Sequence, residues 1–156
     1  MESGNGTPYA GLAEQTLFSA KDVNKEAVAS RAAERSKEET RRREMAQSRA
    51  EEVRRLKAPV EITAEKIASF MNRVHLAARQ GQKEILILRF PSDLCTDGGR
   101  AINNAQPAWE ETLVGVPKQI YQVWLELLKP RGFALHAEVL DFPNGMPGDV
   151  GLFCRW

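Results

Sequence analysis

The chain is poor in cysteine and in long apolar runs. Cys95 and Cys154 are its two cysteines among 156 residues, too few for the disulfide framework of a small secreted domain, so we expect two free thiols. No stretch approaches the roughly 18 apolar residues of a membrane-spanning helix. Residues 1–20 contain no base and no apolar core segment, unlike a secretory signal. We therefore expect a soluble, cytoplasmic protein that does not bind membranes.

Net charge is also small, because 22 basic residues face 21 acidic ones. The charges are nevertheless unevenly spread. Residues 1–20 carry 2 acids and no base, residues 21–57 carry 12 bases and 8 acids, and residues 58–156 carry 10 bases and 11 acids. Attraction to a nucleic acid or another anionic partner must therefore come from the second of these segments.

The composition predicts a disordered N-terminus followed by a helical arm. Residues 1–19 begin with a stretch rich in Gly, Ser, Asn, Thr and Pro, which cannot offset the entropy cost of ordering. Residues 20–58 are dominated by Ala, Glu, Arg and Lys, and neither Gly nor Pro occurs in them. Acids precede bases by four positions at Glu38 to Arg42, Glu39 to Arg43 and Glu51 to Arg55, a spacing that supports a helix in water.

The arm does not have the pattern of a coiled coil. In the best heptad register, four of the nine seam positions are charged, namely Arg35, Glu39, Arg42 and Arg49. This pattern favours a single solvated helix. The alternative is a helix that folds against a partner, with the cluster Arg41, Arg42 and Arg43 as its contact.

A new unit is expected to begin at Pro59, which cannot continue a helix, and to span residues 59–156. Residues 60–62 suit a short strand, Thr63 suits a helix N-cap, and Gly81 ends the helix that follows. The apolar run within residues 83–90 predicts a strand covered on both sides, which would be central in its sheet.

The second half of this unit predicts a helix and a hairpin. Pro117 and Gly132 bracket an apolar stripe at helical spacing. Residues 133–142 alternate between apolar and other side chains, and residues 150–156 form a second candidate strand beyond a turn rich in Pro, Asn and Gly. The expected fold class is therefore α+β, with a small mixed sheet of three or four strands, two packed helices and the order β-α-β-loop-α-β-β.

This order of elements over residues 59–156 resembles that of Alba-type chromatin proteins and of the C-terminal domain of translation initiation factor three. The resemblance implies a nucleic-acid-binding platform, to which the basic arm would add phosphate contacts.

Residues 91–116 form a long connection, and long connections in compact domains are often functional. The candidate ligand residues in it are Asp93, Cys95, Asp97, Gly98, Gly99, Arg100 and Asn103. Backbone N–H groups at the two glycines could hold an anion, although no Lys followed by Ser or Thr completes a phosphate loop. The alternative is a structural turn in which Arg100 pairs with an aspartate.

Other chemistry-bearing residues are scattered. Cys95 has aspartates as its nearest charged neighbours in sequence, so nothing there lowers the pKa of a nucleophilic thiol. His75 and His136 have no metal-ligand spacing, and we expect neither a metal nor a cofactor. Trp109 either packs its loop onto the domain or anchors a protein partner.

Together these patterns predict a non-enzymatic protein-interaction or regulatory protein, whose α/β domain and charged arm bind a macromolecular partner. One alternative is a nucleic-acid-binding module that uses Arg41 to Arg43 for phosphate contacts. The other is a small enzyme with a pocket around Cys95, Asp97 and Arg100.

Overall fold

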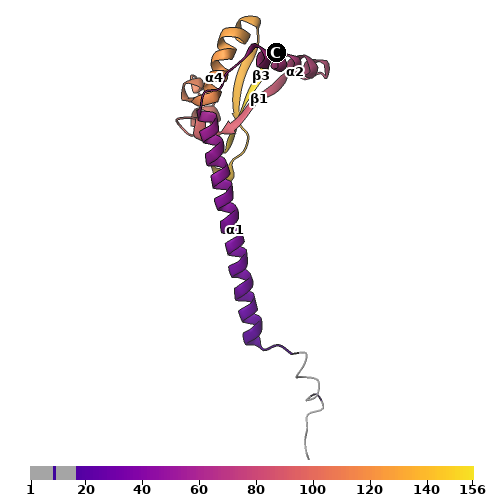
Figure 1. Cartoon of the computed structure of the whole chain (residues 1–156), viewed down its shortest axis with the longest axis vertical. Coiled ribbons are helices and arrows are strands. Elements are labelled where there is room, and N and C mark those ends of the chain that lie inside the picture. The colour runs from indigo at the N-terminus through magenta and orange to yellow at the C-terminus, as the bar shows by residue number, and fades with distance from the viewer. Residues whose placement is uncertain (1–8, 10–16) are drawn as a thin grey trace, which may run out of the picture. The chain divides into compact units, whose positions relative to one another are not determined.

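The computed structural model describes Tyr9 and residues 17–156 (Figure 1). Most of the predicted disordered segment, residues 1–19, lies outside the described residues. Contacts divide the chain into two compact units, residues 1–46 and residues 47–156. The described helices and strands are α1 (Ala20–Lys57), α2 (Ala64–Arg79), β1 (Glu84–Pro91), η2 (Ser92–Leu94), α3 (Arg100–Asn103), η3 (Trp109–Thr112), α4 (Gly115–Val123), η4 (Trp124–Leu128), η5 (Lys129–Arg131), β2 (Ala134–Val139), η6 (Pro143–Gly145) and β3 (Asp149–Arg155).

The predicted arm is the helix α1. Ser19 caps its start, because the Ser19 hydroxyl accepts a hydrogen bond of 3.1 Å from the backbone N–H of Asp22. Two of the three predicted charge pairs are present, Arg42 with Glu38 and Arg43 with Glu39. Every residue from 17 to 48 is exposed, so local helix propensity and side-chain pairs, not burial, support this stretch.

The last turns of α1 belong to the second compact unit, whereas the sequence placed the whole of residues 20–58 in the arm. Val53 and Leu56 pack against the core of the α/β domain. This end of α1 lies so close to Gly115 that a side chain there would clash. A Cβ atom added to Gly115 would lie 2.2 Å from the carbonyl oxygen of Leu56. The helix therefore continues into the domain and does not stop at its edge.

The sheet has three strands in the order β1-β3-β2, and both pairings are antiparallel. The predicted fold class is confirmed as a small α+β fold. Two details of the prediction are wrong, because no described strand is parallel to another and β3, not β1, is the central strand. The predicted hairpin is present as β2 and β3, which pair from Ala134 with Arg155 to Val139 with Val150.

One face of this sheet carries the core. Val150, Leu152 and Cys154 alternate along β3 and are each buried. Phe90 from β1 and Leu113 from the long connection complete the centre of the cluster. The connection is thus a packed part of the domain, with η2, α3 and η3 folded within it.

The expected strand at residues 60–62 is absent. The backbone of Val60 bonds to the Gln119 side chain and not to a strand. The Gln119 amide accepts a hydrogen bond from the N–H of Val60 at 3.0 Å and donates one to the carbonyl of Val60 at 3.1 Å. The domain therefore lacks the first strand of the β-α-β-loop-α-β-β order, on which the resemblance to Alba-type proteins rested. The predicted caps of α2 are present, with Thr63 accepting from the N–H of Lys66 and Gly81 following in the left-handed conformation.

Candidate functional site

The long connection uses its polar groups internally. Asp97 acts as the cap of α3, because its carboxylate accepts hydrogen bonds from the N–H groups of Gly99 at 3.0 Å and Ala101 at 2.6 Å. Gly98 and Gly99 have φ of +68° and +84°, which glycine adopts without strain. The N–H of Gly98 in turn donates to the carbonyl of Cys95. The amides that could have cradled an anion are therefore occupied.

Cys95 is buried at 4% exposure. Burial above all, together with the nearby Asp97 and Asp93 carboxylates, raises the pKa of its thiol to about 11. A thiol with this pKa carries almost no thiolate at neutral pH, so Cys95 is not activated as a nucleophile. Cys154 is likewise a free thiol and fully buried, and burial raises its pKa to about 11.

Arg100 and Asn103 lie exposed on α3. The expectation that Arg100 pairs with an aspartate is wrong, since it forms no ion pair with any residue that the structure describes. Asp97 caps the helix and Asp93 pairs with Arg49 at 2.7 Å, so neither carboxylate serves Arg100. The structure therefore joins Asp97 to the backbone of Gly99, whereas the Asn103 side chain donates only to Asn104 among the described residues and the Arg100 side chain forms no ion pair with them.

An ion-pair cluster at the junction of α1, β1 and β3 was not predicted. Asp149 forms ion pairs with two arginines, one through each carboxylate oxygen. Arg49 Nη1 lies 3.3 Å from Oδ1, and Arg89 Nε lies 2.7 Å from Oδ2. Arg49 also donates to the carbonyl of Gly148 at 3.1 Å. The hydrogen bond to Asp149 raises the pKa of the Arg89 guanidinium. This cluster, in which Arg49 also pairs with Asp93 and Arg89 with Asp141, ties the end of α1 to the domain.

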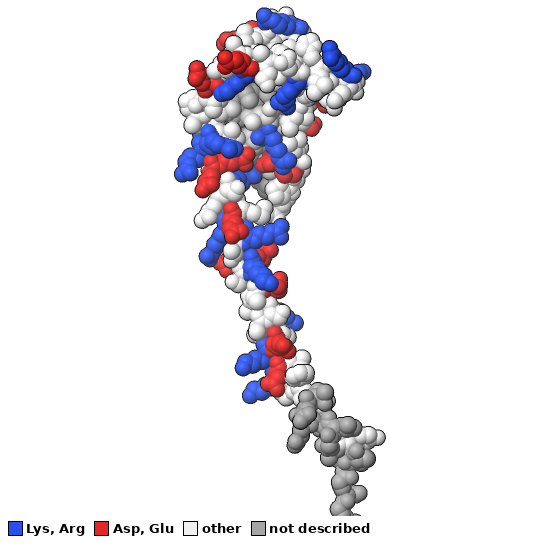
Figure 2. Space-filling model, turned by 45° about the vertical axis from the view of Figure 1, so that its right-hand side comes forward, with Lys and Arg blue, Asp and Glu red and all other residues white. Residues whose placement is uncertain are grey.

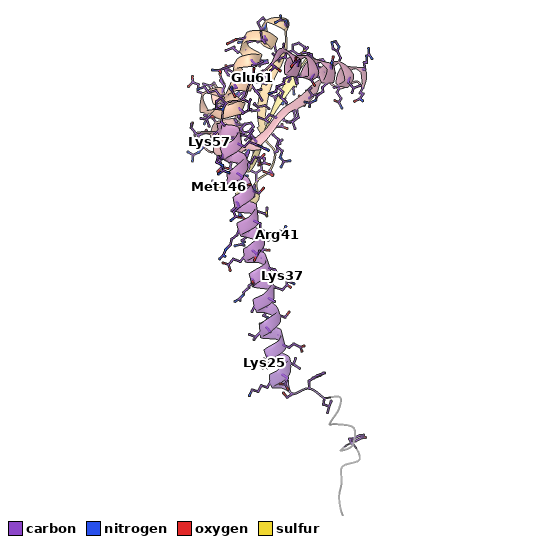
Figure 3. All side chains as sticks on the ribbon, in the orientation of Figure 1. Lys25, Lys37, Arg41, Lys57, Glu61 and Met146 are labelled. Atoms are coloured by element: carbon purple, nitrogen blue, oxygen red, sulfur yellow. The ribbon has the colours of Figure 1, made fainter. Side chains whose placement is uncertain are left out.

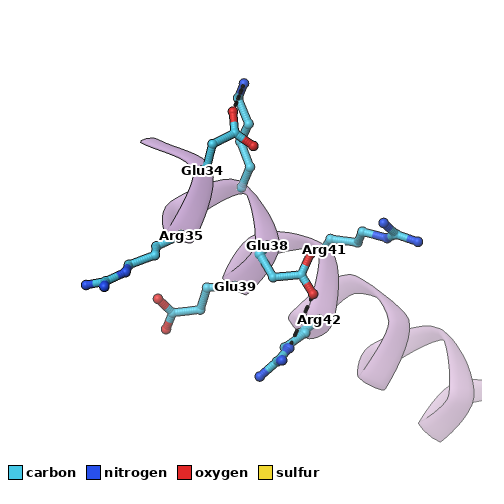
Figure 4. Close-up of a pocket in the computed structure, with 7 residues that line it drawn as sticks. Glu34, Arg35, Glu38, Glu39, Arg41 and Arg42 are labelled. Atoms are coloured by element: carbon cyan, nitrogen blue, oxygen red, sulfur yellow. Dashed lines mark hydrogen bonds and ion pairs between the residues drawn. The ribbon is translucent and has the colours of Figure 1, made fainter. Parts of the chain in front are cut away.

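The basic run on α1 has a different character. Arg42 lies 3.4 Å from Glu38 and Arg43 lies 2.5 Å from Glu39, whereas Arg41 forms no ion pair with a described residue. The close-up in Figure 4 shows Arg41, Arg42 and Glu38 on the surface of one helix, with the Glu38–Arg42 pair dashed. The shallow hollow there is bounded by α1 alone. Figure 2 shows basic and acidic side chains interspersed along the helix, and Figure 3 shows Lys25, Lys37 and Arg41 spread along it.

Trp109 is partly buried and packs against the core cluster. Its ring meets the ring of Tyr121 edge to face, with centroids 6.4 Å apart and planes at 73°. Tyr121 continues the aromatic row to Trp124 at 5.7 Å. Much of the Trp109 ring is thus used to fasten the connection onto α4.

An apolar groove between α2 and α4 was missed by sequence reasoning. It has a volume of about 260 Å³, its walls include Phe70 of α2 and Ile120 of α4, and Ile87 of β1 lines it as well. Trp124 and Leu128, at the two ends of the π-helical turn η4, also line the groove. The sequence marks both helix faces as apolar, but apolar spacing does not show whether a face meets its neighbour or leaves a gap.

Among the described residues, no His, Cys, Asp and Glu side chains gather in a group of three or more that could hold a metal ion. None of the described helices is long and apolar enough to cross a membrane. His136 stacks on Phe153, with ring centroids 5.1 Å apart, and His75 is exposed on α2.

Comparisons of the chain with protein-family models, with curated proteins and with solved structures gave no match.

Proposed function

We propose that this chain is a non-enzymatic interaction protein that binds a macromolecular partner along the exposed stretch of α1. The observation that carries the proposal is the exposure of every residue from 17 to 48, of which residues 20–48 form about eight helical turns with nothing of the described chain packed on them. Apolar side chains are exposed on it, among them Val28 at 66% and Met45 at 63%. A helix with such a surface gains buried area when a partner covers it.

The charges on this stretch favour a protein partner over a nucleic acid. Two of the three arginines in the Arg41–Arg43 run already pair with glutamates one turn away. Phosphate contacts would have to displace those pairs, whereas a protein surface with charges of both signs can meet them as they stand. A nucleic acid remains the second candidate, because residues 21–57 carry four more bases than acids.

The chemistry of the long connection supports the non-enzymatic part of the proposal. Asp97 caps α3, Asp93 pairs with Arg49, and Cys95 is a buried thiol with a raised pKa. These three side chains therefore have structural roles in the fold, and none is arranged as a general base or a nucleophile.

The test is affinity capture from the native cell with the full chain and with an Arg41→Ala, Arg42→Ala, Arg43→Ala variant. The variant should lose the partner, while its domain should unfold at the same midpoint because these side chains are solvated. The control variant Arg79→Ala, Lys118→Ala removes exposed charges from α2 and α4 and should keep the partner. Equal capture by all three proteins would contradict the proposal. Capture that disappears after nuclease treatment and falls steeply with salt would favour the nucleic-acid alternative.

A further inference from the structure

The groove takes most of its lining from α2, α4 and η4, and Val60, Ile62 and Ile87 complete it. From α2 it is lined by Lys66, Ile67, Phe70 and Arg73, a set that recurs at helical spacing over two turns of one face. The lining residues of α4 and η4 run from Val116 to Leu128, a longer stretch of chain than the one from Lys66 to Arg73. A groove lined in this way by two helices has the form that receives the apolar face of a third helix.

Two cations flank the apolar part of this groove. Lys66 and Arg73 are seven residues apart, which places their backbones about 10 Å apart along the axis of α2. Phe70 lies between them on the same face. The groove therefore offers positive charge, an apolar middle and positive charge again.

Both cations keep hydrogen-bonding capacity. Lys66 donates to the carbonyl of Glu61 at 2.5 Å, and Arg73 donates to the carbonyl of Leu86 at 3.1 Å. Neither forms an ion pair with a residue in the described part of the chain. An ammonium group has three donors and a guanidinium has five, so each has donors left for a carboxylate. No acidic side chain is among the described residues that line the groove.

From this arrangement we propose that the groove binds a short amphipathic helix of a partner protein, with two acidic residues at positions i and i+7 and large apolar residues at i+3 and i+4. The two carboxylates pair with Lys66 and Arg73, and the apolar side chains enter the groove beside Phe70. The volume of about 260 Å³ admits side chains and not a whole helix, so the ligand helix lies over the groove. This surface is separate from the exposed stretch of α1, and the inference does not rest on binding there.

The experiment uses the full chain labelled with ¹⁵N and three designed helical peptides of about 18 residues. The first carries Glu at i and i+7 and Leu at i+3 and i+4, the second replaces both Glu by Lys, and the third replaces both Leu by Ser. The first peptide should shift the amide signals of α2 and α4 and the indole N–H signal of Trp124. At low ionic strength it should bind about tenfold or more tightly than either of the others.

Charge reversal at the groove provides the matched variant. Lys66→Glu with Arg73→Glu should invert the preference, so that the Lys peptide becomes the tighter ligand. Arg79→Glu with Lys118→Glu changes the net charge equally at exposed positions outside the lining and should leave the preference as it is. Thermal unfolding shows whether each variant is folded. If the reversal variant does not fold, Lys66→Gln with Arg73→Gln replaces it, and this variant should bind the Glu and Lys peptides equally.

Several results would overturn the inference. They are equal binding of the Glu and Lys peptides, signal changes confined to other elements, and no binding of the Glu peptide at millimolar concentration. Decanoate is the fourth probe, and groove signals that move with decanoate but with no peptide would assign the groove to an apolar carboxylate instead. None of these results bears on the arm, whose proposal is tested separately with the Arg41–Arg43 variant.

Discussion

Arg49 and Asp149 lie 100 positions apart in the chain, yet Arg49 Nη1 approaches Asp149 Oδ1 to 3.3 Å. Arg89 contacts the other carboxylate oxygen of Asp149 at 2.7 Å, so one acidic side chain joins α1 to β1 across the central strand. The Asp149 side chain is 22% exposed, whereas the pairs of the exposed arm are more than half exposed. The ion pairs of the junction are therefore the ones expected to affect stability.

Replacement of Asp149 by Asn should lower the free energy of unfolding by about 1–3 kcal/mol, because two guanidinium groups lose their shared charged acceptor. The measurement is urea unfolding at neutral pH. Glu39→Gln is the matched control, since it removes a carboxylate from an exposed pair and should cost less than about 0.5 kcal/mol. Equal effects of the two substitutions would show that the junction cluster is no stronger than a surface pair.

Gly115→Ala tests how closely α1 approaches the domain. The added Cβ would lie 2.2 Å from the carbonyl oxygen of Leu56 and would also strain a residue with φ of +64°. Gly98→Ala is the control, because its φ of +68° is similar but nothing lies within 4 Å. Strain alone should cost about 1 kcal/mol at Gly98, and the clash should add clearly to this at Gly115. Thermal unfolding of both variants measures the difference, and similar melting temperatures would mean that α1 does not pack there.

Two shortened chains test where the folded unit begins. A chain of residues 47–156 should be as stable as the full chain, because it keeps Arg49, Val53 and Leu56. A chain of residues 59–156 loses the apolar contacts of the last two and should be less stable by about 2–4 kcal/mol. Denaturant unfolding of both chains decides the point. The boundary expected from the sequence at Pro59 would be right if the shorter chain were equally stable.

Alkaline pH should destabilise the domain through its two buried thiols. Burial raises the pKa of Cys95 and Cys154 from the ordinary 9.0 to about 11, so the folded state holds these protons more tightly than the unfolded state. Their contribution is fully present below pH 9 and is lost as the pH rises from about 9 to 11, to a limit of about 3 kcal/mol for each thiol.

The check is urea unfolding of the wild type and of a Cys95→Ala, Cys154→Ala variant across this pH range. The variant should start less stable at neutral pH but should lose less stability on the way to pH 11. Parallel curves for the two proteins would refute the raised pKa values.

Sequence patterns predicted the elements that depend on caps and turns within a few residues. Thr63 and Gly81 marked the ends of α2, and the turn before Asp149 marked the β2–β3 hairpin. Pairing between distant segments was not predicted, since nothing near β3 in sequence states that β1 joins it on the other side. The side chain of Gln119, which replaces a strand at Val60, is a long-range effect of the same kind.

The candidate sites divide in the same way. Arg41 to Arg43 could be chosen from composition alone, because an exposed charged helix is visible in the sequence. Arg49 belongs to the same helix and has the same residue type, but its role depends on Asp93 and Asp149, which only the folded chain brings near. The groove depends on a gap between two predicted apolar faces, and a gap has no local sequence signal.

The measurement that tests the proposed function most directly is hydrogen exchange of the free chain and of the complex recovered by affinity capture. In the free chain, amides of residues 20–46 should exchange much faster than those of β1 and β3, because no buried contact slows their opening. In the complex, the amides of this stretch that lie near Arg41 to Arg43 should exchange more slowly than in the free chain. Unchanged exchange along this stretch in a complex that forms would contradict the claim that the exposed helix is the partner-binding surface.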